Sequence, residues 1–206
     1  MNEGYSDVLD RIASSSPTPG GGSVAALTLA HAHSLALMVA RLTEGRERGK
    51  DGQGAAASVL SSSTGGLRLA LELAERDAEA FDDVMVAFRM PKGNPMEVED
   101  RKQSIFSATL AAATAPLETA KEAVTFLCSI TELARYGNSN ALTDLAAAAE
   151  LAHSAAYIAG LNVRINIDSI EGDESDDIKR QIESLITESS VVIEDIRVTI
   201  SRRLGW

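Results

Sequence analysis

The sequence predicts an all-α fold, a single-domain, up-and-down bundle of long helices. Alanine is abundant and forms runs such as LAAATA and DLAAAAELA, which let helices pack closely through small side chains. Aromatic residues make up only 4% of the chain, so a sheet core rich in aromatic and β-branched residues is not expected. No segment shows a clear period of two; VRINI is the only short strand candidate, and it lies inside a helical pattern.

The first half of the chain is expected to hold three helices. Residues 6–14 form a short amphipathic segment whose apolar residues fall on one side. A glycine loop follows, and Ser23 is a good N-cap for a helix that runs to about residue 43. The polar segment TEGRERGKDGQG is expected to be a turn. A long helix then covers about 55–89 and is stopped by the proline and glycine of MPKG.

The second half is expected to contain further helices separated by clear breaks. One begins near Pro95 and enters an alanine run, and Pro116 starts or kinks another that continues to about residue 135. The turn GNSNALTD opens a helix that runs to about residue 167. The acidic turn EGDESDD precedes the last helix, over about 176–203.

Length and composition indicate one domain spanning residues 1–206, without a repeat or a linker. The net charge is -11 with no basic stripe, so nucleic acid is not expected as a partner. The longest apolar run, 24–42, contains histidine, serine and arginine, which favours a buried helix over a membrane span. The N-terminus lacks a signal-peptide profile, and the single cysteine, Cys128, is expected to be a small buried hydrophobe. Both features suit a cytoplasmic protein.

Asp77 is the most unusual polar residue in the chain. On a helical wheel of LELAERDAEAFDDVMVAF, the apolar residues Ala70, Leu73, Phe81 and neighbouring positions fall within about 40° of it. The other acidic residues of this helix fall on the far side. A carboxylate on an apolar face either meets a partner or has its pKa raised by desolvation. It is therefore either a structural group that caps or pairs with a neighbour, or a general acid–base.

A second polar stripe lies in the helix that follows GNSNALTD. Asp144 and Asn162 are eighteen residues apart, or five whole turns, so they share a face. Asn166 lies about 40° further round the same face. Small residues separate these polar groups, which indicates either a ladder of hydrogen bonds between helices or the wall of a pocket.

The remaining polar motifs give weaker signals. Arg89 and Lys92 lie at a broken helix end, where they either complement the helix dipole or bind an anionic group. His31 and His33 point about 160° apart, so they form a poor metal pair. EGDESDD lacks the ligand spacing of a calcium loop, and GGGS lacks the GK[ST] of a P-loop. No metal site is therefore expected.

Several separated motifs together resemble a known family. SPTPGGGSVAAL, RDAEAFDDVMVAFRMPK, and GNSNALTD followed by GLNVRINI occur in the order and spacing of the formiminotetrahydrofolate cyclodeaminase and methenyltetrahydrofolate cyclohydrolase family. The resemblance covers nearly the whole chain, from Val8 to about Ile167. It implies an all-α homodimer that dimerises through helices, with a folate site near the subunit interface.

The resemblance also assigns roles to individual residues. It implies that Asp77 is the catalytic acid and that the substrate is a tetrahydrofolate derivative, with no metal or redox cofactor. Three glycines before the helix would let a flat ligand approach the backbone, and Arg89 and Lys92 would bind the glutamate tail. The expected substrate-binding residues are Gly20, Gly21, Gly22, Ser23, Phe81, Arg89, Lys92, Asn138, Asn140, Asp144 and Asn162.

Two positions depart from the family pattern. Gly49 and Gly160 stand where the family commonly has an aromatic residue, so a wider pocket or weaker stacking against the pterin is expected. The chain is therefore expected to be a folate one-carbon enzyme, either a cyclodeaminase or a cyclohydrolase. A folate-like ligand-binding module without turnover and a purely structural helical dimer remain as alternatives.

Overall fold

The computed structural model describes residues 3–44, 50–168 and 170–206, and all regular structure in these ranges is helical. The all-α single domain is confirmed, and VRINI lies inside a helix. The elements are α1 (Glu3–Ile12), α2 (Gly21–Glu44), α3 (Lys50–Phe88), α4 (Pro95–Ala112), α5 (Thr114–Ser129), α6 (Thr131–Tyr136), the 3₁₀ turn η1 (Ser139–Ala141), α7 (Leu142–Ile167) and α8 (Asp173–Leu204).

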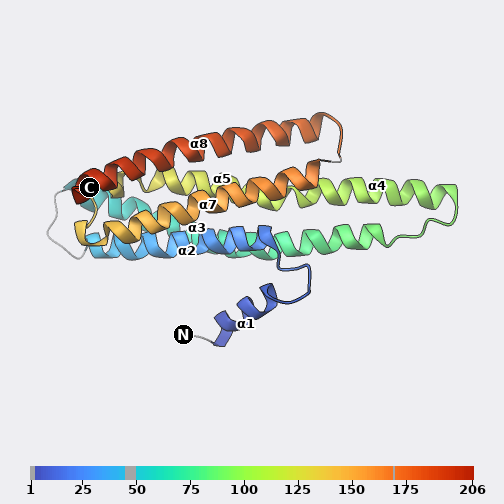
Figure 1. Ribbon diagram of the computed structural model, residues 1–206, viewed down its shortest axis with the longest axis horizontal. Helices are drawn as coiled ribbons and strands as arrows, with labels where there is room; N and C mark the ends of the chain where they lie inside the picture. The colour runs from blue at the N-terminus through green and yellow to red at the C-terminus, as the bar shows by residue number, and fades with distance from the viewer. Residues whose placement is uncertain (1–2, 45–49, 169) are drawn as a thin grey trace.

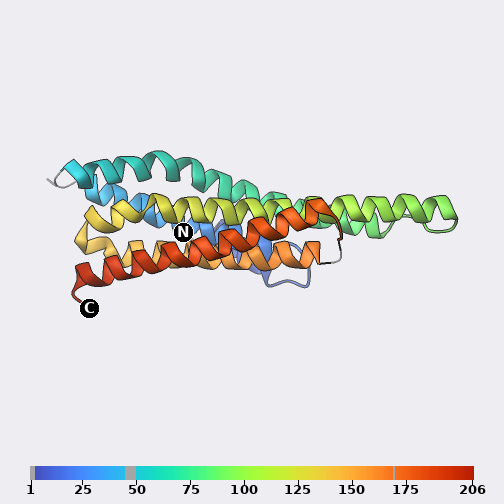
Figure 2. The same cartoon turned by 90° about the horizontal axis from the view of Figure 1, so that it is seen from above.

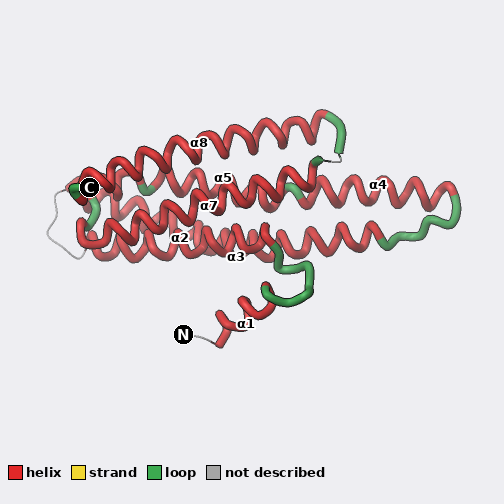
Figure 3. Tube along the Cα trace, in the orientation of Figure 1, coloured by secondary structure: helices red, strands yellow, loops and turns green. Residues whose placement is uncertain are grey.

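The long helices run alternately in opposite directions along one axis, as an up-and-down bundle does (Figure 1). Helices α4 and α5 follow each other end to end and together form one pass of the chain (Figure 2). The far halves of α3 and α4 extend beyond the other helices as a hairpin. Helix α1 lies to one side of the bundle, with Tyr5 OH 3.3 Å from His31 Nε2 of α2, and a long loop joins it to the start of α2 (Figure 3).

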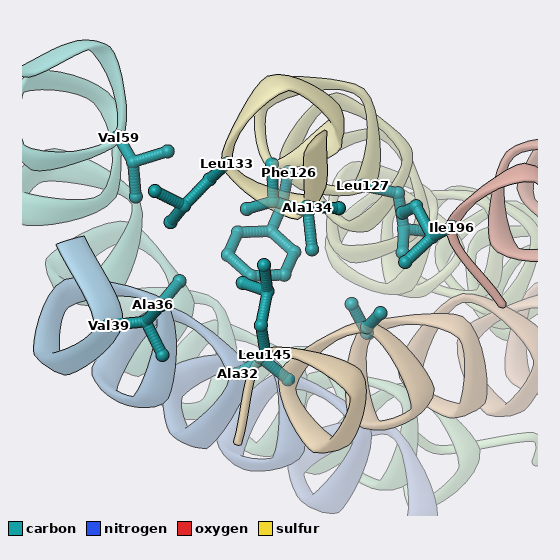
Figure 4. Packing of buried hydrophobic residues seen from close by; sticks show 14 of the residues in the cluster. Ala32, Ala36, Val39, Val59, Phe126, Leu127, Leu133, Ala134, Leu145 and Ile196 are labelled. Carbon is teal, nitrogen blue, oxygen red and sulfur yellow. The ribbon is translucent and has the colours of Figure 1, made fainter. Parts of the chain in front are cut away.

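The core is built largely from alanine, as the composition predicts. Buried alanines from α2, α3, α5 and α7 bring these helices close together, and a few large side chains fill the space between them. Phe126 of α5 lies at the centre, with Leu145 of α7 and Leu133 of α6 beside it (Figure 4). The ring is 1% exposed. Close packing of this kind fixes the relative positions of the helices that carry the candidate site.

The break between α4 and α5 shows how proline and asparagine act together. Pro116 has no N–H, so it cannot bond the carbonyl four residues earlier, that of Ala112. Asn166 of α7 supplies the missing donor, since its Nδ2 lies 2.9 Å from Ala112 O. The chain therefore starts a new helix at Thr114, close to the expected Pro116, and Asn166 joins two helices as the hydrogen-bond interpretation predicts.

Two helix starts differ from the expected ones. Helix α2 begins at Gly21, so the prediction of Ser23 as its N-cap is wrong. The amide of Val24 bonds to Gly20 O at 3.0 Å, which puts Gly20 at the cap position and turns the Ser23 side chain toward α3. Helix α3 begins at Lys50, inside a segment expected to be a turn.

Cys128 is exposed, so the prediction that it is buried is wrong. The neighbouring residues Phe126, Leu127 and Ile130 take the inward positions of this stretch, which leaves the cysteine on the outer face. Partial burial, and then the charge of Glu188, raise the pKa of the thiol.

Among the described helices, α2 alone is long and apolar enough to cross a membrane by length and composition. However, 61% of its most apolar window is buried inside the protein, as expected for the core helix of a bundle. The helix therefore does not indicate a membrane protein.

Replacing Phe126 by Ala should lower the free energy of unfolding by about 3–5 kcal/mol, because a large cavity would form at the centre of the core. The exposed neighbour Thr125→Ala is the matched control and should change it by less than about 1 kcal/mol. Urea unfolding followed by circular dichroism measures both. Equal effects of the two substitutions would contradict the central role of the ring.

Candidate active site

The candidate site lies where the first turn of α2 meets the second half of α3. Asp77 is half-buried and turns its carboxylate toward α2, as the helical wheel predicts. The carboxylate lies directly against the backbone of Gly22, because a Cβ on that residue would lie 2.6 Å from Asp77 Cγ. Only glycine allows this close approach, so the last glycine of the triplet is required for the contact with Asp77.

Ser23 fixes the orientation of the carboxylate. Its Oγ donates a hydrogen bond to Asp77 Oδ2 at 2.9 Å, and the serine is 1% exposed. Burial raises the pKa of the Asp77 carboxyl, while hydrogen bonds from the side chain and the backbone N–H of Ser23 partly oppose that rise. The pKa stays above its ordinary value, so this carboxyl can hold a proton and release it closer to neutral pH than an exposed aspartate can.

Asn162 lies on the other side of the α2 start. A Cβ on Gly21 would lie 3.5 Å from Asn162 Nδ2, so the glycine backbone and the amide group face each other. Asn162 Nδ2 donates to Ile158 O of its own helix at 2.9 Å. Of the residues predicted from the sequence, the structure therefore brings together Gly20, Gly21, Gly22, Ser23, Asp77 and Asn162.

A groove of about 500 Å³ opens beside Ser23, between α1, the loop to α2, and α3. Its cation, Arg11, belongs to no motif in the sequence, and neither does its acidic wall of Glu75, Glu79 and Asp82. No sequence signal could have placed Arg11 there, because only the path of the loop at Thr18 and Pro19 brings α1 back over this surface.

Three predicted binding residues lie farther along the α3–α4 hairpin. Phe81 is 38% exposed, and Arg89 and Lys92 are exposed near the tip. Arg89 follows Asp77 by twelve residues, which corresponds to about 18 Å along a helix axis. Within one chain, the two cations therefore do not lie near the Asp77 carboxylate.

The other predicted residues lie at the opposite end of the bundle. Asp144 is eighteen residues from Asn162 on α7, or about 27 Å along the axis. Asn138 is 2% exposed, and its side chain donates to Leu42 O and accepts from the amide of Asn140. Asn138 therefore ties the end of α2 to the start of α7, and Asn140 is exposed beside it.

Within the described ranges, no group of three or more His, Cys, Asp or Glu side chains is placed to hold a metal ion. His31 is exposed and His33 is buried, so they do not form a pair, as the wheel predicts. The site offers instead a carboxyl group with a raised pKa, a serine hydroxyl and the amides of a first helical turn. Fold and site thus define a helical-bundle domain with a half-buried carboxyl group held against the start of α2.

More particularly, the chain belongs to the formiminotransferase-cyclodeaminase family, whose model matches residues 4–184. A methenyltetrahydrofolate cyclohydrolase of Methylorubrum extorquens is 30% identical over 205 residues, and the match covers 99% of both chains. The formimidoyltransferase-cyclodeaminases of Sus scrofa and Rattus norvegicus are 28% and 30% identical over 86% and 84% of this chain. The chain spans 33% and 32% of those two relatives.

A solved structure agrees with the family assignment. A formiminotetrahydrofolate cyclodeaminase from Thermotoga maritima superposes with a TM-score of 0.80 at 25% sequence identity. The superposition covers 99% of this chain and 96% of that one. The family that the motifs resemble is therefore confirmed, over almost the whole chain.

The structure changes the interpretation of one departure from the family pattern. A Cβ on Gly160 would lie 2.5 Å from Ile186 Cδ1 of α8, so the missing side chain makes room for α8. The expectation that Gly160 widens the pocket is therefore wrong, because a side chain at this position would run into Ile186 and Ile182 of α8. Gly49 lies outside the described residues.

Asp77→Asn should stabilise the protein at neutral pH. Because the pKa of Asp77 in the folded protein is raised above 3.8, the folded state binds this proton more tightly than the unfolded chain does. The resulting stability is fully present below pH 3.8 and is lost as the pH rises through the folded-state pKa. The advantage of the Asn variant should therefore grow with pH.

Urea unfolding of both proteins between about pH 3 and pH 8 tests this expectation. A difference in the free energy of unfolding that stays constant over the whole range would contradict it.

Proposed function

We propose that this protein is a folate one-carbon enzyme that forms or hydrolyses 5,10-methenyltetrahydrofolate, with Asp77 as its general acid–base. One observation carries the proposal: the Asp77 carboxyl has a raised pKa and is held by Ser23 against the backbone of Gly22. The relatives named as cyclohydrolase and cyclodeaminase support the folate substrate class. They do not favour a non-catalytic or purely structural role.

In cyclodeamination, N10 of 5-formiminotetrahydrofolate attacks the amidine carbon, and the bond from that carbon to the terminal nitrogen then breaks. The nitrogen leaves as ammonia, carrying its own hydrogen, the hydrogen of N10 and one proton from Asp77. Burial favours the protonated carboxyl at the start of this step. The carboxylate that remains stabilises the 5,10-methenyl cation beside it.

In the cyclohydrolase direction, the same group starts ionised. The Asp77 carboxylate takes a proton from a water molecule as its oxygen attacks the methenyl carbon, which neutralises the positive charge of the substrate. The bond from that carbon to one of the two nitrogens it bridges then breaks. Asp77 gives its proton to this nitrogen, the added hydroxyl loses its proton to solvent, and formyltetrahydrofolate leaves. The Ser23 hydroxyl bonds Asp77 Oδ2 and leaves Oδ1 toward Gly22. Both directions balance without a metal or a redox cofactor.

The start of α2 supplies groups that suit the rest of the substrate. The amides at the first turn of a helix have no partner within that helix, and they attract negative or polar groups. Gly21 is exposed and carries no side chain, so a flat ring can reach these amides. The Asn162 side chain, which faces Gly21, adds a polar group to the same surface.

The active form is proposed to be a homodimer in which a second copy completes the site. Two features support this. The tip of the hairpin exposes Arg89 and Lys92 about 18 Å along the helix axis from Asp77 of its own chain, where a second copy can meet them. In addition, Tyr157, Leu161 and Ile165 form an exposed apolar stripe on α7, with exposed fractions of 52%, 45% and 71%, next to Asn162. Such a stripe suits a subunit interface.

Asp77→Asn should reduce turnover by a factor of about 100 or more, because the variant can neither donate nor accept the proton. The absorbance of the methenyl band is followed with 5,10-methenyltetrahydrofolate and, separately, with 5-formiminotetrahydrofolate. Loss of the band faster than in buffer identifies a cyclohydrolase, and its appearance identifies a cyclodeaminase. Asp83→Asn, on the exposed face of α3, is the matched control and should keep wild-type turnover.

Unchanged turnover in Asp77→Asn would refute the assigned role of this residue. A folded wild-type protein that leaves both substrates unchanged would refute the proposed enzyme activity. Tight folate binding without turnover would then identify the ligand-binding alternative.

Mixed dimers test whether the site is shared between copies. Asp77→Asn and the double variant Arg89→Ala, Lys92→Ala should each have low activity alone at limiting substrate. After unfolding and refolding together, half of the sites in the mixed dimers would combine an intact Asp77 with intact cations. Activity should therefore return to about a quarter of the wild-type value. No recovery, with mixed dimers present by mass spectrometry, would show that these residues act within one chain.

A further inference from the structure

The interface between α2 and α3 contains two contacts of the same kind. In the first, Asp77 of α3 lies against Gly22 of α2. In the second the roles are exchanged: the His33 ring of α2 lies against Gly66 of α3, where a Cβ would lie 2.6 Å from His33 Nε2. Each contact places a titratable side chain directly on the bare backbone of the opposite helix.

The two contacts belong to one register of the two helices. His33 follows Gly22 by eleven residues on α2, and Asp77 follows Gly66 by eleven residues on α3. Eleven residues make three turns and about 16 Å of helix. Because α2 and α3 run in opposite directions, both contacts form at the same alignment of the two helices (Figure 1).

A shift of one turn would break both contacts together. Moving α2 by four residues along α3 would set Ala26 opposite Asp77 and Ala70 opposite His33. Both alanines are fully buried and carry a Cβ, and a Cβ at either place would overlap the side chain that faces it. The two glycines therefore admit one register of α2 against α3 and exclude this neighbouring one.

The His33 ring is closely packed, although its buried position is unfavourable for a polar side chain. It is 2% exposed, and its centroid lies 4.6 Å from that of Phe126 in an edge-to-face contact. Its Nε2 lies 3.4 Å from Glu122 Oε1, yet neither ring nitrogen has a partner in hydrogen-bond geometry within the described chain. A buried polar group without a hydrogen-bond partner destabilises a fold. Hydrogen bonding therefore does not explain why a histidine occupies this buried position.

We infer that His33 and Gly66 are positioning residues, whose contact sets the register and spacing of α2 and α3 that place the Asp77 carboxylate on Gly22 and Ser23. Phe126 and Glu122 contact the ring from a third helix, α5. The helices are stiff and closely packed, so a displacement at Gly66 is carried along the interface to Asp77. The catalytic consequence rests on the proposed function; the effect on the geometry of Asp77 does not.

Gly66→Ala tests the inference, with Gly65→Ala as its matched control. A Cβ on residue 66 would overlap the His33 ring, whereas a Cβ on residue 65 would meet nothing within 4 Å. Gly66→Ala should lower kcat by a factor of about 10–100 with little change in KM, because a displaced general acid loses its alignment. It should also shift the pKa of the Asp77 carboxyl, measured by carbon NMR. Gly65→Ala should leave both unchanged.

Two further variants keep the test decisive. The double variant Gly66→Ala, His33→Ala removes the overlapping ring and should return the pKa of Asp77 toward its wild-type value. His33→Gln leaves Gly66 in place and introduces no overlap, so it reports on the loss of the ring even where Gly66→Ala does not fold. It should shift the pKa of Asp77 in a protein that remains folded.

The outcomes separate this inference from the proposed function. A lower melting temperature of Gly66→Ala and His33→Gln, with kcat and the pKa of Asp77 at wild-type values, would overturn the inference and leave a purely structural contact. Absence of turnover in the wild type would refute the proposed function. The pKa of Asp77 would still decide the inference in that case, since NMR needs no activity.

Discussion

The contact between the Asp77 carboxylate and the bare backbone of Gly22 is the constraint on which the candidate site depends. A carboxylate can lie on a helix backbone only where the facing residue has no Cβ, and only where the two helix axes are close. The contact also requires α2 to begin at Gly21, because that start turns the Ser23 hydroxyl toward Asp77. The contact therefore depends at once on a glycine in the sequence, on where α2 begins and on the hydrogen bond from Ser23.

The alanine-rich core supplies the second condition. Ala26, Leu73 and Ala74 form a small buried cluster beside the site, and two of these three side chains are single methyl groups. Small side chains bring α2 and α3 close together but fill little space, so the exact register matters more than in a core of large residues. The two glycine contacts along this interface are consistent with that requirement, since each admits its side chain in a single alignment.

The sequence predicted the features that depend on local periodicity, and it failed where the path of the chain decides. The wheel correctly turned Asp77 inward, because Leu73 and Ala70 on the same face are buried. It also placed Phe81 on this apolar face, yet that side chain is 38% exposed, since the second half of α3 extends beyond the other helices (Figure 1). Likewise, Asp144 and Asn162 share a face of α7 but lie at opposite ends of the bundle. A helical wheel reports direction around an axis and carries no information on where neighbouring helices end.

The net negative charge of the protein bears on how the proposed site would bind a folate. A chain of net charge -11 repels an anionic folate, and a strongly negative pocket would oppose binding further. In the proposed cyclodeamination, a buried carboxyl avoids this conflict, because desolvation favours its neutral form while the substrate enters. The same desolvation makes the later ionised state costly unless a cation lies beside it, and the methenyl group is such a cation. In the proposed cyclodeamination, the low polarity around Asp77 thus ties its ionisation to the step in which the positive charge of the methenyl group forms.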